Sequence, residues 1–255
     1  MRRTNLMARF FIYVFLGLLT LFFLSACEMQ QPENIPQRME KDVRETTEKT
    51  YTGYSDANEH GYAWAKVTVR GDDITRVELM EILSTGNEKD YETYQYEPSV
   101  KAYEEMPERF VEADSADVDV YTGATHSSEK FKQAVARALD YAKGGVEGTY
   151  YDGTFQGESE RTDYGYAVAL VTIKDDKISN VELKEYDANG NQKDFSQYQW
   201  EAAVEANEEM AERFVEANSP DVDLYTNATQ SSIRYKEAVT NALRHARKNP
   251  DKDVQ

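Results

Sequence analysis

One short phrase occurs twice in the 255-residue chain, and each copy holds a threonine whose hydroxyl could accept a phosphoryl group. The copies span residues 119–128 and 223–232, and the second begins 104 residues after the first. The threonines are Thr125 and Thr229. Gly123 lets the backbone turn sharply and leaves room for an enzyme to reach the Thr125 hydroxyl. A phosphate there would lie at the start of the following helix, where unpaired N–H groups favour negative charge.

The two copies agree at most positions of the loop. The candidate site residues are Asp119, Tyr121, Thr122, Gly123, Ala124, Thr125 and Ser127, and in the second copy Asp223, Tyr225, Thr226, Asn227, Ala228, Thr229 and Ser231. Asn227 replaces Gly123, and because Asn tolerates a left-handed backbone best after Gly, the loop shape can survive the change. We expect Ser127 or Ser128 to cap the following helix or to donate to a phosphate oxygen.

The pattern Asp-x-x-[Ser/Thr]-Gly-Ala-Thr-x-Ser resembles the flavinylation motif of FMN-binding domains. These domains occur in flavin subunits of the sodium-pumping NADH:quinone reductase and Rnf complexes, and in bacterial surface lipoproteins. In that family the last motif threonine is joined to FMN by a phosphoester, which a separate magnesium-dependent flavin transferase makes from FAD with release of AMP. The resemblance implies covalent FMN on Thr125 and Thr229. It leaves open whether Asp119 and Asp223 shape the loop or are recognised by the transferase.

Several repeated aromatic residues are candidates to stack on the flavin ring. Tyr121 and Tyr225 lie inside the motif and are the preferred pair. The other pairs are Tyr62 and Tyr166, Tyr94 and Tyr198, and Tyr96 and Trp200. For these we expect packing in the core or on a half-buried sheet rather than contact with flavin.

The repeat extends far beyond the motif, because residues 51–143 match residues 155–247 without a gap. A repeat of this length is domain-sized. Each copy has the pattern of a β-hairpin, then a helix, the motif loop and a last helix. The expected strands are 63–69 and 74–79, then 167–173 and 178–183, and the expected helices are 99–113, 127–143, 203–217 and 231–247. The predicted class is α+β, with two tandem homologous domains, each a small antiparallel sheet packed with helices.

The predicted helices contain a proline and an apolar stripe. Pro107 should break or kink the first predicted helix, since proline removes a helical hydrogen bond. The last helix of each copy carries an apolar stripe at helical spacing that should face the core. The first stripe is Phe131, Val135, Ala138, Leu139 and Ala142.

The ends of the chain have a different composition. Residues 1–26 combine arginines, a long apolar run and small residues near the expected cleavage site, which is typical of a secretory signal peptide. Cys27, the only cysteine, stands where a bacterial lipoprotein signal places the acylated residue, so residues 1–26 would be removed. The alternative is an uncleaved membrane anchor. We expect residues 27–50 to be a flexible stalk, 51–143 and 149–247 the two FMN-binding domains, and 248–255 a tail.

Composition excludes several classes of function. The net charge of −18 makes nucleic acid and anionic lipid surfaces poor partners. If Cys27 is acylated, no thiol remains for a disulfide, an iron–sulfur cluster or haem attachment. The three histidines are too few and scattered for a convincing metal site. The exchange of His126 for Gln230 also argues against a catalytic histidine in the motif.

The favoured interpretation is a redox carrier, itself a substrate of a flavin transferase rather than an enzyme. The tandem arrangement resembles two-flavin surface lipoproteins of Gram-positive extracellular electron transfer. That resemblance implies a lipid anchor on the extracellular face of the cell membrane, electrons from a membrane NADH dehydrogenase through quinone, and acceptors such as ferric iron or free flavin. One alternative is a non-redox surface-binding lipoprotein with vestigial motifs. Another is a donor to a dedicated extracellular reductase.

Overall fold

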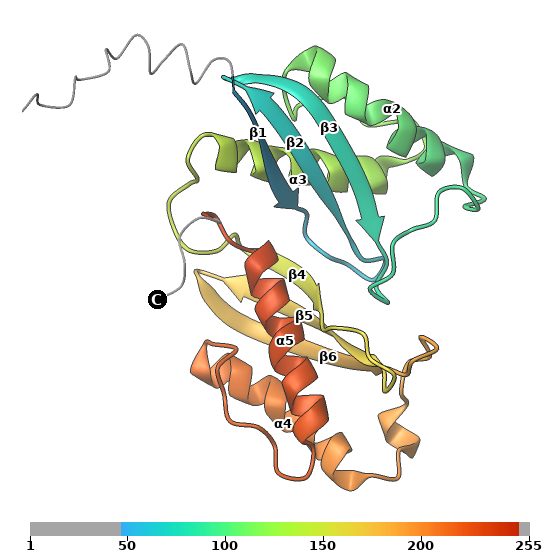
Figure 1. Cartoon of the computed structure of the whole chain (residues 1–255), viewed down its shortest axis with the longest axis vertical. Coiled ribbons are helices and arrows are strands. Elements are labelled where there is room, and N and C mark those ends of the chain that lie inside the picture. The colour runs from blue at the N-terminus through green and yellow to red at the C-terminus, as the bar shows by residue number, and fades with distance from the viewer. Residues whose placement is uncertain (1–46, 250–255) are drawn as a thin grey trace, which may run out of the picture. The chain divides into compact units, whose positions relative to one another are not determined.

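Two copies of one α+β unit make up the part of the chain that the computed structural model describes, residues 47–249 (Figure 1). Each copy contains a three-stranded antiparallel sheet whose strands follow sequence order. The predicted signal peptide, Cys27, most of the stalk and residues 250–255 lie outside the described residues. Within residues 47–249 no helix has the length and apolar character needed to cross a membrane.

The first copy builds its sheet from a predicted hairpin and one further strand. Its elements are β1 (Glu48–Tyr54), β2 (Tyr62–Arg70), β3 (Asp73–Ile82), α2 (Glu97–Ala113) and α3 (Thr125–Ala142). Alternate residues of β2 are buried, as expected for a strand with one face on a core. Helix α3 packs on β1 and β2 while α2 packs on β3, so both helices serve this sheet.

The second copy repeats this plan element by element. Its elements are β4 (Gly153–Glu158), β5 (Tyr166–Lys174), β6 (Lys177–Tyr186), the 3₁₀ turn η1 (Phe195–Gln197), α4 (Glu201–Ala217) and α5 (Thr229–His245). Even the irregularity of the hairpin recurs, between Thr68 and Val69 in one copy and between Thr172 and Ile173 in the other. The predicted α+β class and the duplicated sheet-and-helix unit are confirmed.

The outer strands β1 and β4 were absent from the expected hairpin plan. They are edge strands, and β1 is largely exposed, so it lacks the alternation that marks β2. Each contains a glycine pressed against a helix: a Cβ on Gly53 would lie 2.1 Å from the Ala134 carbonyl oxygen, and one on Gly157 would lie 2.2 Å from the Ala242 nitrogen. Because β1 begins at Glu48, the predicted stalk boundary at residue 50 was placed too late.

Helix α2 is continuous through Pro107, so the predicted break is wrong. The helix buries Ala102, Met106 and Phe110 completely, at the four-residue spacing of one helical face. The second copy buries Ala206, Met210 and Phe214 in the same way without a proline. Packing of this stripe on the sheet therefore outweighs the hydrogen bond that proline removes.

The cores confirm most of the predicted helical stripe. Phe131, Val135 and Ala138 are fully buried, whereas Leu139 and Ala142 are partly buried at the core boundary. The predicted tail begins too early, because the Lys248 nitrogen donates to the Thr149 carbonyl at 3.0 Å. Asn249 donates through its side chain to Val146 at 2.8 Å. Lys248 and Asn249 are therefore hydrogen-bonded to the segment that connects the two copies.

The two copies contact each other within one compact unit. The ring of His245, the last residue of α5, stacks on Tyr54 of β1 at a centroid distance of 3.9 Å and lies 5.3 Å from Tyr62. Its Nδ1 lies 2.7 Å from the Gln156 carbonyl oxygen. Burial lowers the pKa of His245 to about 4, against the effect of that carbonyl, and the positive charge of Arg244 adds to the lowering.

This pKa predicts acid destabilisation. The folded chain resists protonation of His245 while the unfolded chain protonates it near pH 6.5, so stability should fall as the pH drops from about 6.5 to about 4. The loss from this residue alone is at most about 3 kcal/mol. Urea unfolding at pH 7.5 and pH 4.5 should show a smaller pH effect in His245→Gln than in the wild type. An equal pH effect in both would contradict the assignment.

Candidate functional site

The motif loops of the two copies make the same tight turn. The Ala124 nitrogen donates to the Tyr121 carbonyl at 2.9 Å, and the Ala228 nitrogen donates to the Tyr225 carbonyl at 3.2 Å. The third residue of each turn has a positive φ, 85° at Gly123 and 63° at Asn227. A type II turn requires a positive φ at this position, which Gly adopts freely and Asn tolerates. The expectation that Asn227 preserves the loop shape is confirmed.

A serine hydroxyl fixes each loop to the helix behind it. Ser128 Oγ accepts from the Tyr121 nitrogen at 3.0 Å and donates to the Ala124 carbonyl at 2.8 Å. Ser232 makes the same two bonds to Tyr225 and Ala228. The predicted cap is wrong in detail, because α3 and α5 begin two residues earlier than expected and their N-cap residues, Ala124 and Ala228, provide no side-chain bond.

The helices thus begin at the two threonines themselves. Thr125 is the first residue of α3 and Thr229 the first of α5, and both are exposed. The neighbouring alanines, Ala124 and Ala228, are buried and anchor the turns. Thr122 and Thr226 are exposed. Each candidate acceptor therefore presents its hydroxyl to solvent at a helix N-terminus, where backbone N–H groups favour an anion.

Thr125 stands at the edge of a cavity of about 430 Å³. Its walls come from the motif loop, the first turn of α3, the start of α2 and the segment that follows β3. Tyr96 lines this cavity and donates its hydroxyl to the Gly123 carbonyl at 2.8 Å. The loop and one aromatic wall of the cavity are therefore joined directly.

Thr229 stands at an equivalent cavity of about 730 Å³ in the second copy. Its aromatic lining is Tyr164, Tyr198 and Trp200, and its basic lining is Lys193 and Arg234. The three aromatic side chains are exposed to 80%, 39% and 60%. Large exposed rings beside a cavity are unusual in a soluble domain and suit contact with a flat ligand.

The aromatic residues that line the cavities differ from the preferred pair. Tyr121 and Tyr225 do not line either cavity. Tyr121 packs at the edge of the first core with the Arg109 guanidinium 5.0 Å from its ring, and Tyr225 lies near Arg213 in the same way. Tyr62 and Tyr166 are buried.

Tyr94, Tyr96, Tyr198 and Trp200 are the aromatic pairs that face the cavities. The sequence favoured Tyr121 and Tyr225 because they are close to the threonine along the chain. The turn directs them away from it.

A buried carboxylate under the first cavity was missed from the sequence. Glu81, at the end of β3, accepts from Lys89 Nζ at 2.6 Å, from the Tyr91 hydroxyl at 2.7 Å and from Ser127 Oγ at 3.1 Å. Burial raises the pKa of Glu81, but the hydrogen bonds from Lys89 and Tyr91 outweigh it and hold the pKa below its ordinary value. Lys130 of α3 also lines the cavity and donates to the Gly61 carbonyl at 2.8 Å.

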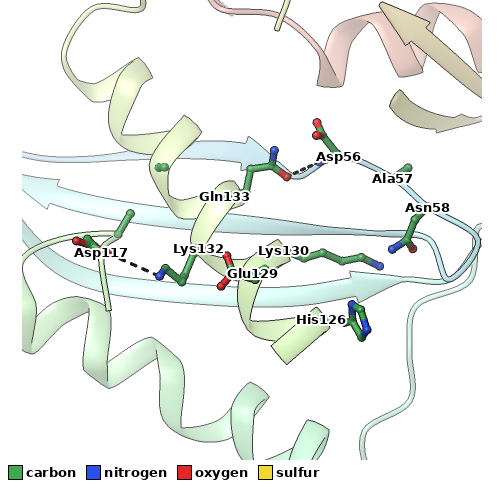
Figure 2. Close-up of a pocket in the computed structure, with 11 residues that line it drawn as sticks. Asp56, Ala57, Asn58, Asp117, His126, Glu129, Lys130, Lys132 and Gln133 are labelled. Carbon is green, nitrogen blue, oxygen red and sulfur yellow. Dashed lines mark hydrogen bonds and ion pairs between the residues drawn. The ribbon is translucent and has the colours of Figure 1, made fainter. Parts of the chain in front are cut away.

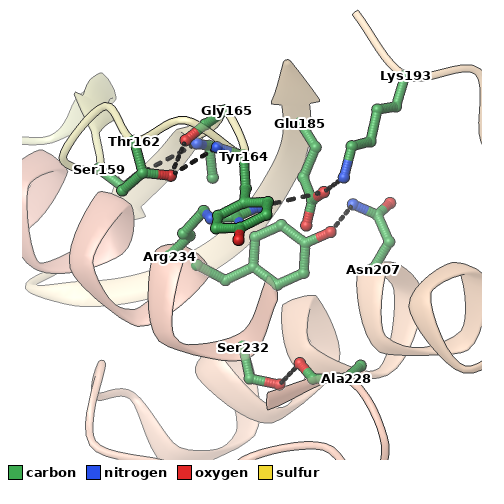
Figure 3. A network of polar contacts seen from close by, with 12 residues as sticks. Ser159, Thr162, Tyr164, Gly165, Glu185, Lys193, Asn207, Ala228, Ser232 and Arg234 are labelled. Carbon is green, nitrogen blue, oxygen red and sulfur yellow. Dashed lines mark hydrogen bonds and ion pairs between the residues drawn. The ribbon is translucent and has the colours of Figure 1, made fainter. Parts of the chain in front are cut away.

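The second copy contains the same charge arrangement (Figure 3). Glu185 is fully buried and pairs with Lys193, while an Arg234 nitrogen lies 3.8 Å from the carboxylate. The Tyr235 hydroxyl stands close to Glu185, which raises the pKa of that tyrosine after the larger effect of burial. Asn207 donates to the same hydroxyl at 3.1 Å. Ser231, like Ser127, is buried in the first turn of its helix.

A sequence signal for these groups exists in the repeat itself. Glu81 and Glu185 occupy equivalent positions, as do Lys89 and Lys193, and Lys130 and Arg234 keep a positive charge. The two carboxylates stand in apolar strand patterns, where an ionised side chain needs a partner. A charge retained at a core position in both copies could have drawn attention to them.

A second hollow of about 610 Å³ lies along α3 on the other side of His126 (Figure 2). It is lined by charged side chains that pair with each other, such as Lys132 and Asp117 at 3.7 Å, and by Gln133, which accepts from the Asp56 nitrogen at 2.8 Å. His126 lines both hollows.

The motif aspartates have exposed side chains. Neither the Asp119 nor the Asp223 carboxylate forms a hydrogen bond within residues 47–249. The Asp223 backbone carbonyl, in contrast, accepts from Arg213 at 3.0 Å. Loop geometry therefore does not require these carboxylates. Across the same residues no group of three or more His, Cys, Asp or Glu side chains could hold a metal ion.

Comparison with known proteins agrees with the motif. Residues 60–140 match the model of the FMN-binding domain family. No curated protein matches the chain. A similar solved structure is the CPE2226 protein from Clostridium perfringens, with 22% identity over 38% of this chain and 88% of that one and a TM-score of 0.33. The matched residues, 60–140, include Thr125 and most of its cavity, so the match indicates an FMN-binding domain in this part of the chain.

Proposed function

We propose that this chain is an electron carrier that holds FMN covalently on Thr125 and Thr229. The observation that carries the proposal is the repeated geometry of the motif. In both copies an exposed threonine hydroxyl begins a helix, two residues after a left-handed turn residue, at the edge of a cavity lined by exposed aromatic and basic side chains. A purely structural turn does not need an exposed hydroxyl or an adjoining cavity.

The cavities fit an FMN group in size and chemistry. Their volumes, about 430 and 730 Å³, lie in the range of small-molecule sites. Aromatic walls suit a flat conjugated ring, and the helix N-terminus suits a phosphate. The second cavity is lined by Lys193 and Arg234, and one buried carboxylate, Glu185, faces both, so one positive charge is left over. This charge favours an anionic ligand. In the first cavity Lys89 and Lys130 are balanced by Glu81 and Glu59, so the helix N-terminus is the main anion-binding feature there.

The attachment itself would be a phosphoryl transfer. The threonine Oγ1 forms a bond to phosphorus of the FMN half of FAD, the bond from that phosphorus to the AMP half breaks, and the hydroxyl proton is released. The acceptor needs only access, because the transferase and Mg²⁺ would supply the catalysis. Asp119 and Asp223, exposed and without partners within residues 47–249, are suited to recognition by such an enzyme.

The bound flavin would supply one- and two-electron chemistry that the protein's own side chains lack. We propose that the chain passes electrons from a membrane NADH dehydrogenase and quinone to an outer acceptor such as ferric iron or free flavin. The predicted lipid anchor on Cys27 would hold it at the extracellular face of the cell membrane. A covalent bond is useful there, because a dissociated cofactor would be lost from the cell.

The proposal predicts stable flavin on two residues. The full chain, coexpressed with a flavin transferase and denatured on a gel, should retain flavin fluorescence and gain the mass of two FMN groups. Thr125→Ala and Thr229→Ala should each remove one group, and the double variant should be colourless. Ser115→Ala, which alters a hydroxyl outside the cavity, serves as the control. A wild-type chain that stays unmodified would support the vestigial, non-redox alternative.

The turn geometry makes a second prediction. Gly123→Asn should preserve attachment at Thr125, because the second copy uses Asn in this conformation. Gly123→Val should reduce it strongly, since a β-branched residue is strained at positive φ by about 1–2 kcal/mol or more. Peptide mass spectrometry reports the occupancy of Thr125, with Thr229 in the same molecule as the internal reference. Equal occupancy in both variants would show that the turn does not control access.

The buried ion pair makes a third prediction. Lys89→Met leaves Glu81 buried without its cation and should lower the free energy of unfolding by about 3–5 kcal/mol at pH 7. The double variant with Glu81→Gln should recover much of this loss, because no buried charge then lacks a partner. Urea unfolding measures both. Similar losses in the single and double variants would mean that packing, rather than charge, dominates.

A further inference from the structure

The wall of the first cavity is held by the second copy of the repeat. Leu83, Ser84 and Thr85, which follow β3, line the cavity beside Thr125. The Leu83 carbonyl accepts from Gln156 Nε2 at 2.9 Å, and the Thr85 carbonyl accepts from the Tyr166 hydroxyl at 2.7 Å. These donors lie on β4 and β5. The hydrogen bonds of this wall therefore cross from one copy to the other.

A third donor completes the contact. Arg161 donates to the Gly86 carbonyl at 3.0 Å, and its guanidinium lies 3.7 Å from the centre of the Tyr166 ring. The Tyr166 ring in turn stacks on Tyr186 at 5.0 Å and is almost fully buried. The donors are thus fixed by their own packing before they reach the wall, so they can hold it in place.

The second cavity is lined by residues of the second copy alone, and residues 187–189, which are equivalent to residues 83–85, are not part of its lining. This segment is supported from within. Asp187 stands where the first copy has Leu83. Its carboxylate accepts from the Asn189 and Asn191 nitrogens, both at 2.9 Å, and from the Asn191 side chain at 3.0 Å. These bonds hold the pKa of Asp187 below its ordinary value, with the Asn191 side chain as the largest cause. A Cβ on Gly190 would meet no atom within 4 Å, whereas one on Gly86 would meet Glu158 at 2.6 Å.

The sequence difference matches the difference in support. Both segments keep the same backbone turn, since the Gly86 nitrogen donates to the Leu83 carbonyl and the Gly190 nitrogen to the Asp187 carbonyl. Leucine at position 83 cannot make the carboxylate bonds that Asp187 adds. Two of the three donors are specific to the second copy, because Thr52 and Ala57 stand at the positions of Gln156 and Arg161. The third donor, Tyr166, is a tyrosine in both copies, since Tyr62 is its equivalent. The change at position 83 is thus accompanied by changes at positions 156 and 161 on the other side of the contact.

We infer that the second copy is a structural part of the first flavin site, with Gln156, Arg161 and Tyr166 as positioning residues. The two sites are then not equivalent: Thr125 depends on the second copy, while Thr229 lies in a self-supported site. The flavin part of this inference rests on the proposed function. The bracing of the wall does not.

The test compares Tyr166→Phe with Tyr151→Phe, which removes a different hydroxyl bond between the copies, to Asp140, in the full chain. Tyr166→Phe keeps the stacked ring and removes only the hydroxyl that reaches the wall. Without flavin, amide exchange over residues 83–89 should become about five- to tenfold faster, the effect of losing one buried hydrogen bond. Exchange over residues 187–193 should not change. Arg161→Met should act in the same direction, and Tyr151→Phe should leave residues 83–89 unchanged.

The second measurement is flavin occupancy after coexpression with the transferase. Tyr166→Phe should lower the occupancy of Thr125 severalfold and leave that of Thr229 unchanged, although residue 166 belongs to the second copy. Unchanged exchange at residues 83–89, or equal loss at both threonines, would overturn the inference. A wild-type chain that takes no flavin would instead defeat the proposed function, and the exchange data would still decide whether the wall is braced.

Discussion

The geometry of each site depends on one buried carboxylate. Glu81 connects the end of β3 to the segment that follows it through Lys89 and Tyr91, and to the first turn of α3 through Ser127. Lys89 continues the connection to Ser99 at the start of α2, at 2.9 Å. A buried ion pair is weak support for stability in general, but it imposes a specific geometry, because every partner must be in place. Here that requirement joins all the elements that surround Thr125.

In the second copy a different residue places a hydroxyl group beside the buried carboxylate. Tyr91, which donates to Glu81, is replaced by Phe195, and Phe131 is replaced by Tyr235, whose hydroxyl stands near Glu185. The hydroxyl has thus moved from the loop to the helix. Such an exchange is expected because an ionised buried group must have hydrogen-bond partners, but different residues can supply them. It indicates that the carboxylate, not the surrounding aromatic residues, is the constrained feature.

The sequence predicted the features that recur in both copies or that show a regular hydrophobic period. The duplicated unit, the β-hairpins, the helices and the turn at Asn227 all follow from local pattern or backbone preference. The sequence did not predict the edge strands, since β1 is too exposed to alternate clearly. It also predicted a helix break at Pro107 and placed Tyr121 beside the cavity. Packing decides both outcomes: the Tyr121 ring lies near Arg109 and does not line the cavity, and α2 packs on the sheet and continues through Pro107.

Differences between the copies carry information that their similarity does not. Where a position faces only its own core, as Phe110 and Phe214 do, the residue is retained. Several positions that face the other copy change, as His245 on Tyr54 replaces Tyr141 of the first copy, although Tyr166 is retained as Tyr62. A duplicated chain has one contact between its copies, and each copy supplies a different side of it, so the two sides must diverge. The same divergence makes the surroundings of the two sites unequal, because the Leu83 carbonyl is held by the second copy whereas Asp187 supports its own segment. Two sites that began alike thereby acquire different surroundings.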